Sequence, residues 1–212
     1  VEMLSEIRDE FETGAGKFVI SGCLGPRGDG YSPAEMMDPQ SAEEYHRVQI
    51  RTFRDAGADL ITAFTLTYAD EAIGLARAAM AENMPVVISF TLETDGRLPD
   101  GQALKDAIRA VDRATENGPA YYMINCAHPS HFAGTLSGDG DWLQRIRGIR
   151  ANASTMSHSE LDNAEELDDG NPHELGRQYR SLLEFLPHAN VLGGCCGTDH
   201  RHVYAIREAC AA

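Results

Sequence analysis

The stretch "DLITAFTLTYADEAIGLARAAMAENMPVVISFT", residues 59–91, contains the unit that predicts the fold class of this chain. An apolar run at 59–65 is followed by a segment of helical period at 69–83 and by a second apolar run at 86–91. The letters "AENMP" mark the end of the helix, because proline cannot continue it. Strand, helix and strand in this order predict two parallel strands joined by a right-handed crossover.

The same unit recurs along the chain. Apolar runs predict strands at 17–23, 59–65, 86–91, 121–126, 149–154 and 190–195. Helical periodicity predicts helices at 42–56, 69–83, 101–117, 141–148, 172–186 and 200–210, and a further helix opens the chain at "VEMLSEIRDEFE". The runs are almost continuously apolar, which is typical of parallel strands covered on both faces. The sequence therefore predicts an α/β fold.

Two α/β architectures fit this pattern, an open doubly wound sheet and a (β/α) barrel. No G-x-G-x-x-G or P-loop signature follows any predicted strand, which disfavours the nucleotide-binding form of the open sheet. Polar and reactive side chains instead end several strands, and in a barrel those ends meet at one mouth, where the chemistry lies. They are Ser21, Cys23, Thr65, Ser89, Thr91, Asn125, Cys126, Asn152, Ser154, Cys195 and Cys196. We therefore expect a TIM-type barrel.

The number of units is too small to close such a barrel. A TIM-type barrel has eight strands, whereas the chain supplies six predicted strands after its opening helix. We therefore expect a single barrel domain over residues 1–212 whose N-terminal units are missing.

Composition limits the classes of partner. With 33 acidic and 18 basic residues the chain has a formal net charge of −15, which argues against nucleic acid. Apolar runs such as "PVVISF" are far shorter than the roughly 20 residues of a membrane span. The N-terminus also lacks the pattern of a signal peptide. We expect a cytoplasmic protein that acts on small molecules, without nucleic acid or membrane partners, and we leave a homo-oligomer open.

Two adjacent cysteines, Cys195 and Cys196, follow the last predicted strand in "NVLGGCCGTDHRH", residues 190–202. Neighbouring side chains of an extended strand point to opposite faces, so the chain must bend for both sulfurs to reach one partner. We expect the flanking glycines to supply the bend through their backbone freedom, and a residue after them to cap the next helix. These are Gly193, Gly194 and Gly197 for the bend, and Thr198 or Asp199 for the cap.

A metal site would give this pair of cysteines a function. Five cysteines, an odd number, do not resemble a secreted disulfide framework, which leaves reduced thiols or metal ligands. A third ligand is available at Cys126, which ends "YYMINC". Three protein ligands with an open fourth position are typical of a catalytic Zn²⁺ site. Three thiolates give that site excess negative charge, so an added thiol would lose its proton yet stay nucleophilic, and the natural reaction is alkylation of a substrate thiol.

Other candidate side chains have plainer interpretations. Cys23 and Cys210 are more typical of core or bystander thiols, and a strained disulfide between the adjacent cysteines is disfavoured in a reducing compartment. The acidic stretch 160–169 is most simply solvated, and the loop "LGPRGDGY", residues 24–31, is a plain connection rather than an anion-binding loop. Four histidines near the expected mouth could be ligands but are more typical of loops or helix surfaces, namely His128, His131, His200 and His202.

Five short motifs span almost the whole chain. They are "SGCLGPRGDGY" at 21–31, "AGADLI" at 56–61, "ISFTLETDGRLPDG" at 88–101, "INCAHP" at 124–129 and "GGCCGT" at 193–198. In this order and spacing they resemble the homocysteine S-methyltransferase family, which includes betaine-homocysteine methyltransferase and the homocysteine-binding module of methionine synthase. The combination of "GGCC" with an upstream "NC" is far more specific than either motif alone.

The resemblance implies an eight-stranded (β/α) barrel, of which the six predicted strands would be strands three to eight. It also implies Zn²⁺ held by Cys126, Cys195 and Cys196, and methyl transfer to homocysteine to give methionine. The methyl donor is S-methylmethionine, S-adenosylmethionine, a betaine or a methylated folate in different members, and nothing in the sequence selects one. Asn152 in "RANAS" matches an asparagine of the family, and the residues expected to line the acceptor pocket are Thr65, Ser89, Asn125 and Asn152.

Two departures from the family pattern concern the substrate amino group. The family's first strand ends in an Asp-Gly-Gly motif that these residues lack, and its "ET" glutamate has no counterpart in "AFTL" at 63–66, where Thr65 offers a neutral oxygen. Either another acid pairs with the ammonium, or the acceptor is not homocysteine in its usual pose. Two other functions stay open, a non-catalytic zinc- or thiol-binding barrel and a different zinc-assisted barrel enzyme. Thiolate ligands disfavour the latter, because they make the metal a poorer Lewis acid.

Overall fold

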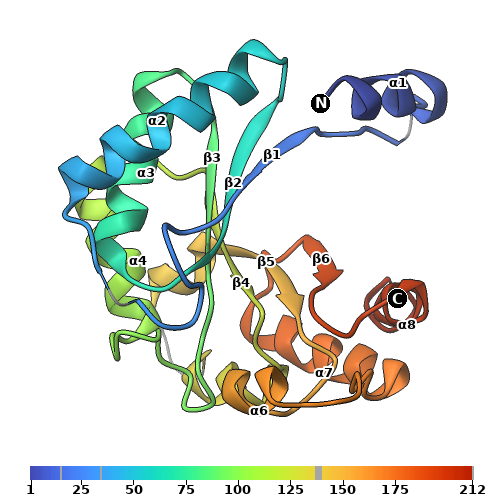
Figure 1. The fold of residues 1–212 in the computed structure, drawn as a ribbon. Helices are drawn as coiled ribbons and strands as arrows, with labels where there is room; N and C mark the ends of the chain where they lie inside the picture. The colour runs from blue at the N-terminus through green and yellow to red at the C-terminus, as the bar shows by residue number, and fades with distance from the viewer. Residues whose placement is uncertain (15, 34, 137–139, 212) are drawn as a thin grey trace.

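The computed structural model describes residues 1–14, 16–33, 35–136 and 140–211. Within them six parallel strands form one sheet, in which each strand pairs with the next along the chain (Figure 1). The strands are β1 (Ser21–Leu24), β2 (Leu60–Leu66), β3 (Val86–Phe90), β4 (Tyr121–Asn125), β5 (Ile146–Ala151) and β6 (Val191–Gly194). The α/β class and the parallel pairing that the repeated unit predicts are therefore confirmed.

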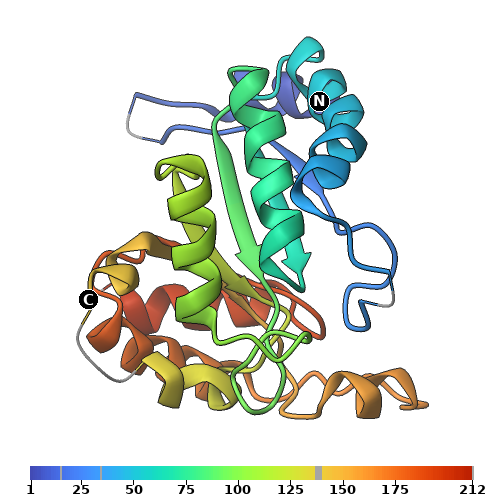
Figure 2. The same ribbon diagram turned by 90° about the vertical axis from the view of Figure 1, so that its left-hand side faces the viewer.

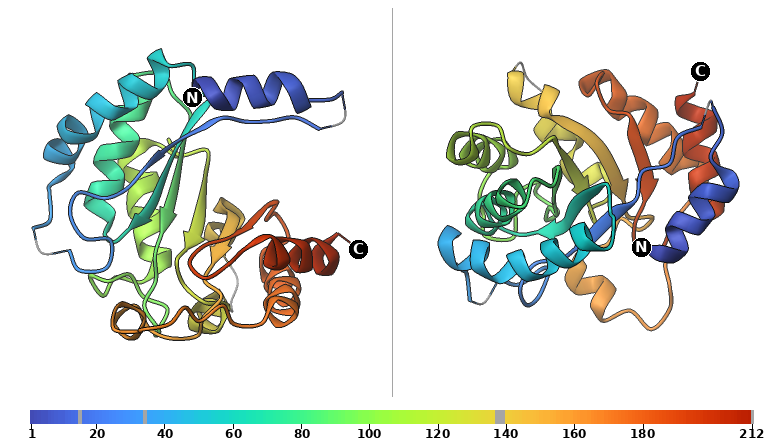
Figure 3. Two further views of the ribbon diagram at one scale, coloured as in Figure 1. Left: turned by 45° about the vertical axis from the view of Figure 1, so that its right-hand side comes forward. Right: turned by 90° about the horizontal axis from the view of Figure 1, so that it is seen from above.

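The sheet curls, and helices cover its outer face (Figure 3). The longer helices are α1 (Glu2–Phe11), α2 (Pro39–Asp55), α3 (Ala69–Ala81), α4 (Leu104–Thr115), α7 (Pro172–Phe185) and α8 (His200–Cys210). The shorter ones are α5 (Pro129–Phe132), α6 (His158–Asp162) and the 3₁₀ helices η1 (Ala133–Leu136) and η2 (Asp141–Arg145). Figure 2 shows α2, α3 and α4 side by side over the sheet. This curled half-barrel is the architecture of part of a TIM-type barrel, with the carboxyl ends of its strands at one edge.

Local sequence fixes where two of the long helices begin. Asp38 caps α2 by accepting a hydrogen bond from the Ser41 backbone N–H at 2.8 Å, and Asn171 caps α7 by accepting one from Glu174 N–H at 3.0 Å. Proline follows each cap, at a position where its missing N–H is not needed. Among the described residues, no helix is long and apolar enough to cross a lipid bilayer.

The sheet and its helices share an apolar core. All of β3 is buried, as expected for a strand covered on both faces. Ile61, Ile88 and Phe90 are completely shielded from solvent. Full burial of each such side chain contributes roughly 1.5–3 kcal/mol to folding. The convex side of the sheet is thus the stable scaffold, and the strand ends are its working edge.

The helix predicted at 141–148 is wrong. The 3₁₀ helix η2 ends at Arg145, and β5 begins at Ile146, earlier than the strand predicted at 149–154. Ile146 is fully buried and pairs with Tyr122 of β4, so the sheet extends further back than the sequence pattern indicates. The first strand is shorter than predicted, because only Ser21–Leu24 pairs with β2.

Gly74 tests the packing of α3 on α2. A Cβ atom at this position would lie 2.4 Å from the Pro39 carbonyl oxygen and 2.5 Å from Ala42 Cβ, so the two helices meet where a side chain is missing. We expect Gly74→Ala to lower the free energy of unfolding by about 1–3 kcal/mol, despite the better helix propensity of alanine. Urea denaturation measures the change. Gly25→Ala is the matched control, because no atom lies within 4 Å of its added Cβ, and a Gly74→Ala variant as stable as the parent would contradict the packing.

Candidate metal centre

Three cysteines meet at the carboxyl ends of β4 and β6. Cys126 directly follows β4, while Cys195 and Cys196 directly follow β6. Their three sulfur atoms all lie within 4.8 Å of one another. Cys126 is buried, Cys195 is half-buried and Cys196 is exposed, so the cluster has one closed and one open side. These are the three cysteines that the sequence groups as a metal site.

The end of β5 holds both arms of the cluster. The backbone N–H of Cys126 donates to the Arg150 carbonyl oxygen at 3.1 Å, and that of Cys195 donates to the Ala151 carbonyl oxygen at 2.9 Å. The Cys196 carbonyl oxygen in turn accepts from Ala153 N–H at 3.0 Å. The separation of the sulfurs is therefore set by backbone hydrogen bonds, not by side-chain flexibility alone.

The bend after β6 arises differently from its prediction. Gly193 and Gly194 are regular strand residues without a positive φ, and only Gly197 of the three has one, at 76°. Gly194 instead allows the Thr198 side chain to approach the backbone closely, because a Cβ atom at Gly194 would lie 2.1 Å from Thr198 Oγ1. That hydroxyl donates to the Cys195 carbonyl oxygen at 2.7 Å.

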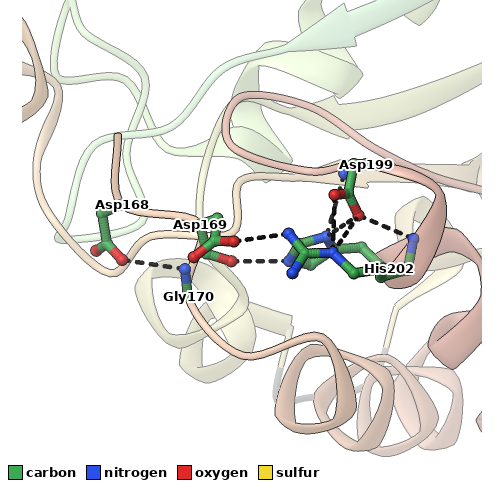
Figure 4. Close-up of polar contacts among 6 residues, drawn as sticks. Asp168, Asp169, Gly170, Asp199 and His202 are labelled. Carbon is green, nitrogen blue, oxygen red and sulfur yellow. Dashed lines mark hydrogen bonds and ion pairs between the residues drawn. The ribbon is translucent and has the colours of Figure 1, made fainter. Parts of the chain in front are cut away.

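The residues after the cysteine pair are tied to the loop before α7 (Figure 4). Asp199 caps α8 by accepting from the Arg201 backbone N–H at 2.8 Å, which confirms one of the two predicted caps. Asp169 binds Arg201 Nη2 through its carboxylate at 2.7 Å, and its carbonyl oxygen accepts from His202 Nε2 at 2.8 Å. The loop thus clamps the segment that carries Cys195 and Cys196 against the sheet.

A hydrogen-bonded network supports Cys126. Asn125 Oδ1 accepts from Ser89 Oγ at 2.5 Å and from Thr65 N–H at 2.9 Å, while its Nδ2 donates to Thr65 Oγ1 at 2.9 Å. Thr65 and Cys126 have φ angles of 60° and 52°, a left-handed conformation that is costly for residues other than glycine. Thr65 Oγ1 lies 3.9 Å from Cys126 Sγ. Three predicted pocket residues thus gather at Cys126, with their polar atoms bonded mainly to one another.

The fourth predicted pocket residue, Asn152, supports the other arm. Its Oδ1 accepts from the Cys196 backbone N–H at 3.2 Å. Asn152 and Cys196 also line a cavity of about 460 Å³, which we name the acidic cavity. Besides these two residues its lining includes Tyr31, Ser154, His158 and four carboxylates, Asp162, Glu165, Glu166 and Asp168.

Tyr31 and His158 are not among the residues predicted from the sequence. Their ring centroids lie 3.9 Å apart with the ring planes tilted by 36°, and His158 Nε2 donates to the Cys126 carbonyl oxygen at 2.6 Å. His158 Nδ1 also lies 3.3 Å from Glu93 Oε1. In the sequence, the only sign of a role at the site is the place of each residue relative to a strand end. Tyr31 ends the loop after the first strand, and His158 follows the polar end of β5.

Contacts among the three thiols favour a thiolate at Cys126. Hydrogen bonds from Cys195 and Cys196 lower the pKa of Cys126 to about 2, and the same contact with Cys126 raises the pKa values of Cys195 and Cys196. Burial, followed by negative charge at Cys126, raises the pKa of Tyr31, which keeps its phenol protonated. One thiolate therefore forms readily, and a bound cation would displace the protons of the other two sulfurs.

The remaining candidate ligands lie outside this cluster. Among the described residues, the group of side chains able to hold a metal consists of the three cysteines alone. Cys23 is exposed on β1 rather than in the core, and Cys210 is half-buried on α8. His202 is buried against Asp169 and Asp199, and His128 Nδ1 lies 2.7 Å from Ser130 Oγ.

Comparisons with known proteins point to one family. The family described as homocysteine S-methyltransferase matches residues 1–210. A curated relative, homocysteine S-methyltransferase from Escherichia coli (strain K12), is 25% identical over 205 residues, which cover 91% of this chain and 63% of the relative. The chain thus spans less than two thirds of that relative's length.

Two solved structures of the homocysteine methyltransferase MmuM from Escherichia coli share the fold. The metallated form has a TM-score of 0.72 at 21% identity, and the oxidized form has a TM-score of 0.75 at 22% identity. Each alignment covers 98% of this chain and 68% of the other.

Substitution of single cysteines tests the cluster. We expect Cys126→Ser, Cys195→Ser and Cys196→Ser each to weaken Zn²⁺ binding by at least about 100-fold, because each removes a thiolate ligand. Competition with a chromophoric chelator measures the affinity. Cys23→Ser is the matched control and should bind the metal as the parent does. Undiminished metal binding by Cys196→Ser would remove that residue from the site.

Proposed function

Because the chain belongs to the homocysteine S-methyltransferase family, we propose that it is a zinc-dependent S-methyltransferase. It would move a methyl group from a small-molecule donor to the sulfur of a thiol, with homocysteine as the acceptor and methionine as the product. The observation that carries this proposal is the convergence of three cysteine sulfurs within 4.8 Å at the strand ends. In the same proposal, β1 to β6 correspond to strands three to eight of a complete barrel, the chain forms one domain, and its location is cytoplasmic.

The donor set fits zinc. Thiolate ligands select zinc over hard cations such as Mg²⁺ or Ca²⁺. Zn–S bonds of about 2.3 Å in a tetrahedral site place the sulfurs about 3.8 Å apart, so sulfurs within 4.8 Å need only a small contraction. Three ligands leave a fourth position, which the exposed side of Cys196 makes accessible.

Each predicted side chain then has a role in this reaction. Bound zinc would hold the acceptor thiol as a nucleophilic thiolate near neutral pH. Thr65, Asn125 and Ser89 would position Cys126, since their polar atoms are occupied by one another. Asn152 would position Cys196 by accepting a hydrogen bond from the Cys196 backbone N–H. It also lines the acidic cavity, where it would face the sulfur of the acceptor thiol.

The acidic cavity supports a positively charged methyl donor. A methyl group passes to a thiolate when the atom that carries it is a good leaving group, such as a sulfonium or a quaternary ammonium. Four carboxylates around the cavity favour such a cation, and Tyr31, which also lines it, is of a residue type that can contact cations through its ring. The proposal therefore favours S-methylmethionine, S-adenosylmethionine or a betaine over a methylated folate, whose glutamate tail is anionic.

Methyl transfer to homocysteine tests the proposal. We expect zinc-loaded protein, prepared as this chain and from the complete reading frame, to form methionine from homocysteine with at least one cationic donor. Product formation is followed by mass spectrometry with a donor carrying a deuterated methyl group. Cys196→Ser should abolish transfer, whereas Cys23→Ser should retain it. The donors tested are S-methylmethionine, S-adenosylmethionine, a betaine and a methylated folate. If zinc-loaded protein from the complete reading frame methylates no thiol with any of them, the chain is a binding protein and the proposal fails.

A further inference from the structure

The charged residues of the sheet are confined to one strand. The six strands contain no aspartate or glutamate, and their only charged residues are Arg147 and Arg150, both exposed on β5. Of the two, Arg150 lines an open groove of about 730 Å³ together with Cys195 and Cys196. We name this hollow the Arg150 groove. Cys196 also lines the acidic cavity, which is a separate hollow.

Arg150 lies between the two arms of the cysteine cluster. It pairs with Asn125 of β4 on one side and with Gly193 of β6 on the other. Its carbonyl oxygen accepts from Cys126 N–H at 3.1 Å. Arg150 thus lies between the two arms, and it lines the same groove as Cys195 and Cys196.

The guanidinium is held in a fixed orientation while part of it stays free. Its central carbon lies 5.0 Å from the centroid of the Phe64 ring, and its Nε donates to the Gly194 carbonyl oxygen at 3.1 Å. Among the described residues, neither Nη atom has a hydrogen-bond or ion-pair partner. A planar guanidinium fixed in this way and free at its outer edge is suited to two parallel hydrogen bonds with a carboxylate.

The other charged side chain that lines the Arg150 groove, Asp199, has a cationic partner in Arg201, which also binds Asp169. Asp199 accepts from Arg201 Nε at 2.8 Å and caps α8 through the Arg201 backbone N–H. Arg150 is therefore the charged side chain of the groove that has outer nitrogens without a described partner, whereas the charged groups of the acidic cavity are mainly carboxylates.

We propose that Arg150 binds the anionic end of the acceptor thiol, and that the acceptors are thiols bearing a carboxylate or sulfonate, with or without an amino group. This inference rests on the proposed function and names the substrate class of the same site. Homocysteine belongs to the class through its carboxylate. The strands carry no carboxylate for its ammonium, and the carboxylate of Asp199 in the groove is already bound by Arg201, so we expect the amino group to add little to recognition.

Binding of three matched thiols to the zinc-loaded chain tests the inference independently of turnover. The thiols are homocysteine, its analogue without the amino group (4-mercaptobutanoate) and its analogue without the carboxylate (3-mercaptopropylamine). Calorimetry should give affinities within about threefold for the two carboxylates. The amine should bind at least about tenfold more weakly, as expected for loss of a charge-assisted hydrogen-bonded pair.

Variants separate recognition from structural support. Arg150→Met should weaken both carboxylates by at least about tenfold and leave the amine unchanged, because only the former lose an ionic partner. Arg150→Lys should restore part of the affinity for the two carboxylates, since lysine keeps the positive charge but lacks the two parallel N–H donors of the guanidinium. Arg147→Met, on the same strand but outside the groove, is the matched control and should bind all three thiols as the parent does. The zinc content of each variant shows that the metal centre is intact.

Opposite results would overturn the inference. They are a preference of the parent for 3-mercaptopropylamine over 4-mercaptobutanoate, an equal loss of all three thiols in Arg150→Met, or no thiol binding at all. Selective binding without methyl transfer would support the role of Arg150 and refute the proposed function. If Arg150→Met methylates homocysteine as well as the parent does, the proposed function would be supported and the role of Arg150 refuted.

Discussion

The site depends on one geometrical constraint, that sulfurs from two strands which are not neighbours must meet across a third. Cys126 follows β4 and the adjacent pair follows β6, so β5 lies between them. Two backbone hydrogen bonds, from Cys126 to Arg150 and from Cys195 to Ala151, draw both arms onto the end of β5. The curl of the sheet turns the three strand ends toward one another (Figure 3), and the apolar core behind them keeps that curvature fixed.

The two hollows beside the cluster differ in charge. Cys196 lines two hollows, the acidic cavity and the Arg150 groove. When a thiolate attacks a methyl group, the displacement is in line. The acceptor sulfur and the leaving group of the donor must therefore lie on opposite sides of the transferred carbon. An acidic side for a cationic donor and a cationic side for an anionic acceptor would orient the two substrates before they react. The network of Thr65, Asn125 and Ser89 adds rigidity beneath the cluster without using its polar atoms on a substrate.

The sequence predicts those features that depend on short-range chemistry. Strands such as Val86–Phe90 can be predicted from the sequence, because burial on both faces requires a continuous apolar run. The cap at Asp199 can likewise be predicted from the residues that follow the cysteines. The start of β5 cannot, because Ile146 joins the sheet through its pairing with Tyr122 rather than through its neighbours in sequence. Tyr31 approaches Cys126 from the loop after β1, and His158 approaches it from the start of α6. The orientation of Arg150 depends on a strand register and on Phe64, which only the folded sheet supplies.

X-ray absorption at the zinc edge shows whether the three cysteines hold the metal. We expect three sulfur neighbours at about 2.3 Å in the zinc-loaded protein, together with one lighter atom. Addition of the acceptor thiol should raise the sulfur count by one at the expense of the lighter atom, because the fourth position takes the substrate. A first shell with two or fewer sulfurs, or a shell that does not change when the thiol is added, would contradict the account.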